Sequence, residues 1–314
     1  MTRPSSLIIS LGIILLMTPG CGQTPPLQPV DLSAVNERLI NICKKDYNFE
    51  PVVKALKNTV WIYVPMKDPM VAIKASEAGP SKSDKREIKL TTKFLESSFV
   101  DNKFVIRYDI GMSDSYTKDP GYGLPYTEEY TAMQRNIIAA VGRAYSDVET
   151  LPAGRNMLVQ AAGGQPTDHG PEFAVIVIAD VLNGMESRFT VYLPDLLRGM
   201  SDQSFFEEYA KRLAADEIYG HDIIKGDFTG RHLDVKEMTW GDFLAKQILH
   251  RIRFKYTQSD FKPSGDATDE ILAAVAQTTS AYSFTDFTSI ELNDLADGKK
   301  YSFDQKQLQT FLRD

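Results

Sequence analysis

The spacing of apolar residues predicts one long helix at residues 126–146. Tyr126, Met133 and Ala144 belong to a run of apolar side chains at steps of three or four, which is the period of one helix face. Thr127 stands where a helix cap is expected, and the two glutamates after it complement the positive start of the helix dipole. This is the strongest local signal in the chain.

A strand hairpin at residues 173–193 is the second clear prediction. Residues 173–179 are apolar throughout, which is typical of a central strand covered on both faces. Asn183-Gly184 indicates a two-residue type I′ turn, and residues 185–193 return with alternating apolar positions. Asp180 ends the first strand, and we interpret it as a carboxylate that meets solvent or a hydrogen bond at the end of the hairpin.

Weaker patterns predict the remaining elements. Two strands are expected around Lys57-Asn58 within residues 52–65, with Pro65 ending the second, then a hairpin at 94–112 and a strand at 282–292. Helices are expected at residues 32–44, 204–215, 239–255 and 268–279, followed by a last short helix; Asp202, Thr239 and Ser302 stand at three expected caps. Helices beside mainly antiparallel sheets place the body, residues 31–314, in the α+β class. A subdivision of the body near residue 200 is left open.

The first twenty residues have the layout of a secretory signal peptide. Arg3 and the amino terminus form a short positive patch, and the uncharged apolar run 7–17 follows. This run is too short to cross a bilayer as a helix, which needs about 20 residues. The segment ends in small residues, which is typical of a signal-peptide cleavage site. We therefore expect residues 1–20 to direct export and to be removed.

The end of this segment resembles the lipobox of bacterial lipoproteins. Met17-Thr18-Pro19-Gly20-Cys21 matches the pattern at Gly20 and Cys21 and departs from it at Thr18, where leucine is preferred. The resemblance implies that Cys21 is the lipidation site. Gly22, which stands where an aspartate would favour inner-membrane retention, favours the outer membrane. Several acyl chains would hold the protein firmly through a proline-stiffened tether, residues 21–30. The alternative is an ordinary signal peptide with an incidental cysteine.

The charge and the cysteine content limit the kinds of partner and of covalent bond that we expect. A net charge of −7 and an isoelectric point near 5.3 give no general attraction to nucleic acid or to anionic lipid. Cys21 and Cys43 are the two cysteines. If Cys21 carries lipid, Cys43 has no partner for an intrachain disulfide, and its place beside the apolar stripe of residues 32–44 predicts a packed side chain.

Three histidines in loops are the candidates for chemistry. His169 follows Asp168, which could orient the imidazole, but adjacent side chains seldom point the same way, so an exposed loop residue is favoured. His221 and His232 share residues 220–234 with three aspartates, which could bind a metal if the loop folds back. Their spacing matches neither a zinc nor a calcium pattern. We therefore predict no catalytic residue, no metal site and no cofactor.

Two functions follow as hypotheses; a third, a solute-binding lipoprotein, would need two paired lobes, which the sequence does not show. The first is a membrane-anchored envelope lipoprotein that faces the periplasm as a non-enzymatic adaptor, accessory or assembly factor. Its contacts would be the membrane, through its N-terminal acyl groups, and other envelope proteins. The alternative is a lipid-anchored hydrolase that uses the His169 loop or the His221/His232 loop. Under the first hypothesis, replacing all three histidines by Gln or Asn leaves the fold intact.

Overall fold

The protein is described by a computed structural model that covers residues 32–72, 89–113, 126–146, 170–202, 208–209, 212, 214–218, 222–257 and 266–312. The helices are α1 (Leu32–Tyr47), α2 (Glu128–Tyr145), α4 (Leu193–Ser201), α6 (Trp240–Thr257), α7 (Ala267–Ala281) and α8 (Gln305–Leu308), with 3-10 turns η1 (Asp222–Ile224) and η2 (Gln309–Leu312). The strands are β1 (Val52–Leu56), β2 (Thr59–Met66), β3 (Lys89–Val100), β4 (Lys103–Ser113), β5 (Phe173–Asp180), β6 (Met185–Tyr192), β7 (Ala214–Ile218), β8 (Ser289–Asp294) and β9 (Lys300–Phe303).

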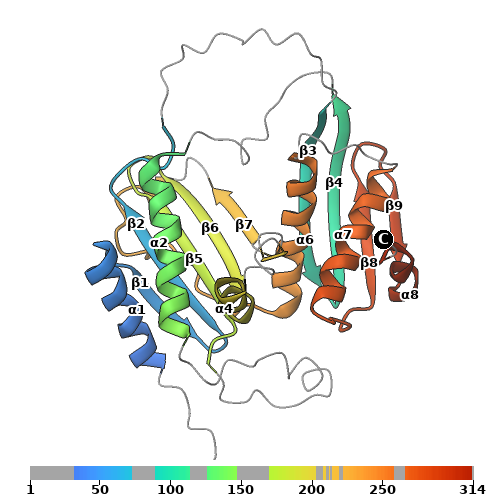
Figure 1. Ribbon diagram of the computed structural model, residues 1–314. Coiled ribbons are helices and arrows are strands. Elements are labelled where there is room, and N and C mark those ends of the chain that lie inside the picture. The colour runs from blue at the N-terminus through green and yellow to red at the C-terminus, as the bar shows by residue number, and fades with distance from the viewer. Residues whose placement is uncertain are drawn as a thin grey trace, which may run out of the picture.

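These strands form two mixed sheets, and the predicted α+β class is confirmed. The first sheet has the order β1-β2-β5-β6-β7 and the second has the order β3-β4-β8-β9. The pairs β2–β5 and β4–β8 are parallel, and the other pairs in the described sheets are antiparallel. Figure 1 shows α1, α2 and α4 on one face of the first sheet and α6 between the two sheets. The first sheet is therefore covered on both faces.

Two apolar clusters hold these layers together. One joins the first sheet to α1, α2 and α4, and Ile62, Ile137 and Ile176 are fully buried in it. The other fills the space between the sheets around α6 and α7, where Phe104, Val177 and Phe243 are fully buried. Successive residues of a strand point to opposite faces, so the uninterrupted apolar run of β5 supplies both clusters.

Most predicted elements are present with nearly the expected bounds. The long helix is α2, and the side chain of its cap Thr127 accepts a hydrogen bond from the backbone of Tyr130. The hairpin at 94–112 is β3–β4, and Thr239 caps α6 by accepting from the backbone of Asp242 at 3.1 Å. Cys43 is fully buried, and burial raises the pKa of its thiol to about 12, which agrees with a packed side chain.

The turn of the β5–β6 hairpin is not the predicted type I′. Residues 181–184 connect the strands, and of Asn183 and Gly184 only the glycine has a positive φ, of 71°. A type I′ turn needs positive φ at both central residues. Instead, Asp180 Oδ1 accepts hydrogen bonds from the backbone nitrogens of Leu182 at 3.1 Å and Asn183 at 2.9 Å. The expected hydrogen bond to Asp180 is confirmed, and it is this carboxylate that shapes the loop.

Two elements within residues 193–215 differ from the prediction. The strand β6 ends at Tyr192 and α4 begins at Leu193, with a proline in its first turn, so Asp202 caps the end of α4 and not the start of another helix. The helix predicted at 204–215 is too long, because Ala214 and Ala215 already belong to β7 and pair with β6. Pairing in a sheet here overrides a local helical pattern.

Further errors concern ends of elements. Pro65 does not end β2, which continues to Met66; the proline is tolerated because β1 pairs with β2 only as far as Tyr63. The strand predicted at 282–292 is restricted to β8, and the last helix is capped by Asp304, since Ser302 lies in β9. Among the helices that the structure describes, none combines the length and apolarity of a membrane span.

Candidate functional site

The imidazole of His232 lies between two carboxylates in the interior. Its Nδ1 is 2.9 Å from Asp227 Oδ2, and its Nε2 forms a very short contact with Glu186 Oε1 on β6. The side chain of His232 is only 7% exposed and that of Glu186 only 1%. The ring of Tyr63 packs edge-on against the imidazole at 5.7 Å between centroids. The segment between β7 and α6 therefore folds back onto β6 through His232.

Asp227 organises this segment. Its carboxylate accepts hydrogen bonds from the backbone of Thr229 at 2.8 Å and of Arg231 at 2.9 Å. The Tyr63 hydroxyl donates to the backbone carbonyl of Asp227 at 2.5 Å. On the other side, Arg188 Nη2 pairs with Glu186 Oε2 at 3.0 Å. The imidazole is thus one member of a network that joins the loop to β2 and β6.

The charges of this network support a protonated imidazole. Burial by itself would lower the pKa of His232, but hydrogen bonds to Asp227 and Glu186, together with their charges, outweigh burial and raise it. Burial would raise the pKa of Asp227, yet the hydrogen bonds from His232 and Thr229 lower it well below its usual value. An imidazolium donates from both nitrogens, which is what two flanking carboxylates require.

The geometry leaves His232 little capacity for catalysis. A general base must reach the proton that it abstracts, and both ring nitrogens of His232 are already occupied by carboxylates. Within the described residues, no group of three or more His, Cys, Asp or Glu side chains is placed to hold a metal ion. His169 and His221 lie outside the described residues, as do Cys21 and the tether.

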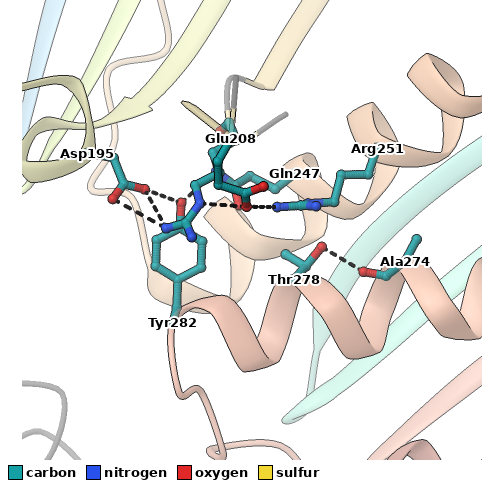
Figure 2. A network of polar contacts seen from close by, with 8 residues as sticks. Asp195, Glu208, Gln247, Arg251, Ala274, Thr278 and Tyr282 are labelled. Carbon is teal, nitrogen blue, oxygen red and sulfur yellow. Dashed lines mark hydrogen bonds and ion pairs between the residues drawn. The ribbon is translucent and has the colours of Figure 1, made fainter. Parts of the chain in front are cut away.

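A second polar network, which the sequence did not indicate, surrounds Arg212. Arg212 pairs with Asp195 of α4, Nη1 to Oδ2 at 3.3 Å, and with Glu208, Nε to Oε1 at 3.0 Å. Tyr282 donates to Asp195 Oδ2 at 2.5 Å, and Gln247 of α6 donates to the Tyr282 hydroxyl at 3.0 Å. Figure 2 shows Asp195 and Tyr282 converging beside Glu208 and Gln247. The network ties α4, α6 and the end of α7 together.

A pocket of about 570 Å³ adjoins this network between α6 and α7. We call it the α6–α7 pocket. Its polar lining is Glu208, Arg251, Lys255, Gln277 and Ser280; its apolar lining is Phe254, Ala274, Ala281 and Leu312. Arg251 Nη2 donates to Glu208 Oε1 at 3.0 Å, and Lys255 pairs with Glu270. His250 is on α6, 8% exposed and stacked on Phe254 at 6.2 Å between centroids.

Three exposed apolar side chains lie on two neighbouring loops at one end of the first sheet. Leu182 in the β5–β6 loop is 59% exposed, and Ile223 and Phe228 in the segment before α6 are 60% and 48% exposed. The two loops are joined by a hydrogen bond from the Gly226 nitrogen to the Val181 carbonyl at 2.8 Å. We call these three residues the loop patch.

Comparison of the chain with protein-family models, with curated proteins and with solved structures finds no match.

Proposed function

We propose that the protein is a membrane-anchored envelope lipoprotein that acts as a non-enzymatic adaptor and binds a protein partner through the loop patch. The anchor is inferred from the apolar segment that ends in Gly20-Cys21. The observation that carries the adaptor function is the exposure of Leu182, Ile223 and Phe228 on two loops that are hydrogen-bonded to one another. Large apolar side chains exposed on neighbouring loops support an interaction surface there.

The position of the loop patch favours a partner away from the anchor. The parallel strands β2 and β5 end on the side of the loops, at Met66 and Asp180. Figure 1 shows α1, which follows the tether in the sequence, beginning near the opposite end of the first sheet. A partner bound at the loops would therefore leave the tether end of the body accessible to the membrane.

The charges around the loop patch favour a protein over an anionic bilayer. The exposed charged side chains of residues 222–239 are Asp222 and Asp234, which are negative, and Lys225, Arg231 and Lys236, which are positive. The half-buried Asp227 and Glu237 add two negative charges. Membrane-binding surfaces carry an excess of cations, whereas protein interfaces combine an apolar centre with a mixed polar rim. The loop patch has the second arrangement.

The hydrolase alternative has lost one of its candidate groups. Since both nitrogens of His232 are engaged, the reaction proposed for the loop histidines would have to use His169 or His221. No contact of the described residues favours such a reaction.

A photo-crosslinking amino acid placed at Phe228 in the full-length protein tests the adaptor function in native envelopes. We expect a specific protein adduct, which is lost when Leu182 and Ile223 are both replaced by serine. The same crosslinker at Val100, which is 52% exposed in the other sheet, is the control and should not give this adduct. Crosslinks from position 228 to lipid alone, or to the same proteins as position 100, would contradict the proposal.

A further inference from the structure

Arg251 has unused hydrogen-bonding capacity in the wall of the α6–α7 pocket. Its side chain is only 10% exposed. Its contact with Glu208 uses Nη2, and its Nε is buried without a hydrogen-bond partner in the part of the chain that the structure describes. A guanidinium has five N–H donors. Buried donors without partners are rare in proteins and call for an explanation.

The carboxylate beside Arg251 is shared. Glu208 Oε1 accepts from Arg251 Nη2 and also from Arg212 Nε, both at 3.0 Å. Burial would raise the pKa of Glu208, but the two arginines outweigh burial and lower it, so the glutamate is ionised. Figure 2 shows Arg251 approaching Glu208 from α6, above the helix that carries Ala274 and Thr278. Arg251 therefore shares its carboxylate partner, and its Nη1, which makes no hydrogen bond to the described residues, can donate to a second oxyanion.

The rest of the pocket lining suits a ligand with an apolar part. Phe254 and Leu312 supply apolar surface, while Gln277 and Ser280 supply exposed polar groups at the rim. A volume of about 570 Å³ lies within the usual range for small-molecule sites. Arginine is well suited to carboxylates because its planar fork can donate two parallel hydrogen bonds.

We propose that the α6–α7 pocket binds a small organic carboxylate, with its oxyanion on Arg251 and its apolar body against Phe254 and Leu312. This site is separate from the loop patch and goes beyond the adaptor function. The ligand needs one negative charge and a compact apolar group, so benzoate is a suitable probe. Benzyl alcohol keeps the ring and removes the charge, and inorganic phosphate keeps an oxyanion and removes the ring.

Isothermal titration calorimetry on the full-length protein in detergent micelles tests the site. We expect benzoate to bind with millimolar affinity and benzyl alcohol and phosphate each to bind at least about tenfold more weakly. Arg251→Gln should weaken benzoate binding by about tenfold or more. Arg253→Gln, on the same helix but outside the pocket lining, is the matched control and should bind as the wild type does.

A second variant separates ligand binding from stability. Gln277 is exposed at the pocket rim, so Gln277→Trp should fill the pocket and block benzoate without removing an ion pair. Circular dichroism melting reports whether each variant is folded. The proposal is overturned if folded wild-type protein does not bind benzoate, if phosphate binds as well as benzoate, or if a folded Gln277→Trp protein binds as tightly as the wild type.

Discussion

At the scale of single residues, the buried environment of His232 predicts that its replacement destabilises the protein. Tolerance of substitution was expected for a loop histidine, but this side chain is buried between Glu186 and Asp227. A buried ion pair adds little net stability compared with an apolar pair of the same shape. Removal of one partner is different, because the other charge then stays in the interior without compensation.

We predict that His232→Gln lowers the free energy of unfolding by about 3 kcal/mol or more. The glutamine can make a hydrogen bond, but it cannot carry the positive charge that faces both carboxylates. Urea unfolding followed by circular dichroism measures the loss. Arg231→Gln, at the exposed neighbouring position, is the control and should change the stability by less than about 0.5 kcal/mol. Equal stability of the two variants would show that His232 does not hold the loop.

The pH dependence of this loss has a defined sign. The pKa of His232 is raised in the folded protein, so its stabilising effect is complete below the unfolded-state pKa of about 6.5. That effect declines as the pH rises through the higher folded-state pKa. The difference in unfolding free energy between wild type and His232→Gln should therefore be largest just below neutral pH and smaller in alkaline solution.

At the scale of elements, β5 is the strand on which both apolar clusters depend. Ile176 and Val177 are fully buried on opposite faces of the strand, one in each cluster. We predict that Ile176→Asp and Val177→Asp each lower the unfolding free energy by about 4 kcal/mol or more, because an unpaired carboxylate would lose its hydration. Thermal melting measures the loss. Lys54→Asp, exposed on the edge strand β1, should leave the melting temperature nearly unchanged.

The contact between α6 and β3 depends on a glycine. A Cβ added at Gly241 would lie 2.0 Å from a ring carbon of Phe99, and that ring packs against Phe104 at 4.9 Å between centroids. We predict that Gly241→Ala costs about 1–3 kcal/mol, since the aromatic group must shift within a packed cluster.

The control for this prediction is another helical glycine. A Cβ at Gly142 would meet the sulfur of Met200 at 1.9 Å, but that methionine is 51% exposed and flexible, so it can move into solvent. Gly142→Ala should therefore cost less than Gly241→Ala in the same unfolding experiment. A larger cost at position 142 would mean that the contact between α6 and β3 is not tightly packed.

At the scale of the whole molecule, the proposed lipid anchor predicts that membrane association depends on Cys21. Cys21→Ser should release the protein from membranes and abolish acyl labelling, because the thiol that carries the lipid would be gone. Membrane fractionation with a labelled fatty acid measures both effects. Cys43→Ala is the matched control, since Cys43 is buried in the body, and it should remain labelled and membrane-bound. Retention of the Cys21→Ser protein at the membrane without acyl mass would refute lipidation.

The sequence was most informative where local periodicity and burial coincide. The helix α2 and the strand β5 were predicted within one or two residues, because each carries an uninterrupted pattern that suits its own geometry. Errors arose where a long-range contact decided the outcome. The start of β7 was predicted as helix, but pairing of Ala214 and Ala215 with β6 fixes it as strand. The turn after β5 follows the carboxylate of Asp180 and not the Asn-Gly signal.

The sequence by itself determined the α+β class and indicated His232 as a candidate for chemistry. Only the tertiary structure decided which side chains surround His232 and the other polar residues of the interior. Glu186 and His232 are far apart along the chain and meet through the return of one loop onto β6. Arg212, Asp195 and Tyr282 come together in the same way from three separate segments. The pattern of apolar residues along the sequence indicates whether a segment is a helix or a strand. A polar network instead depends on which helices and strands pack together, and the tertiary fold decides that.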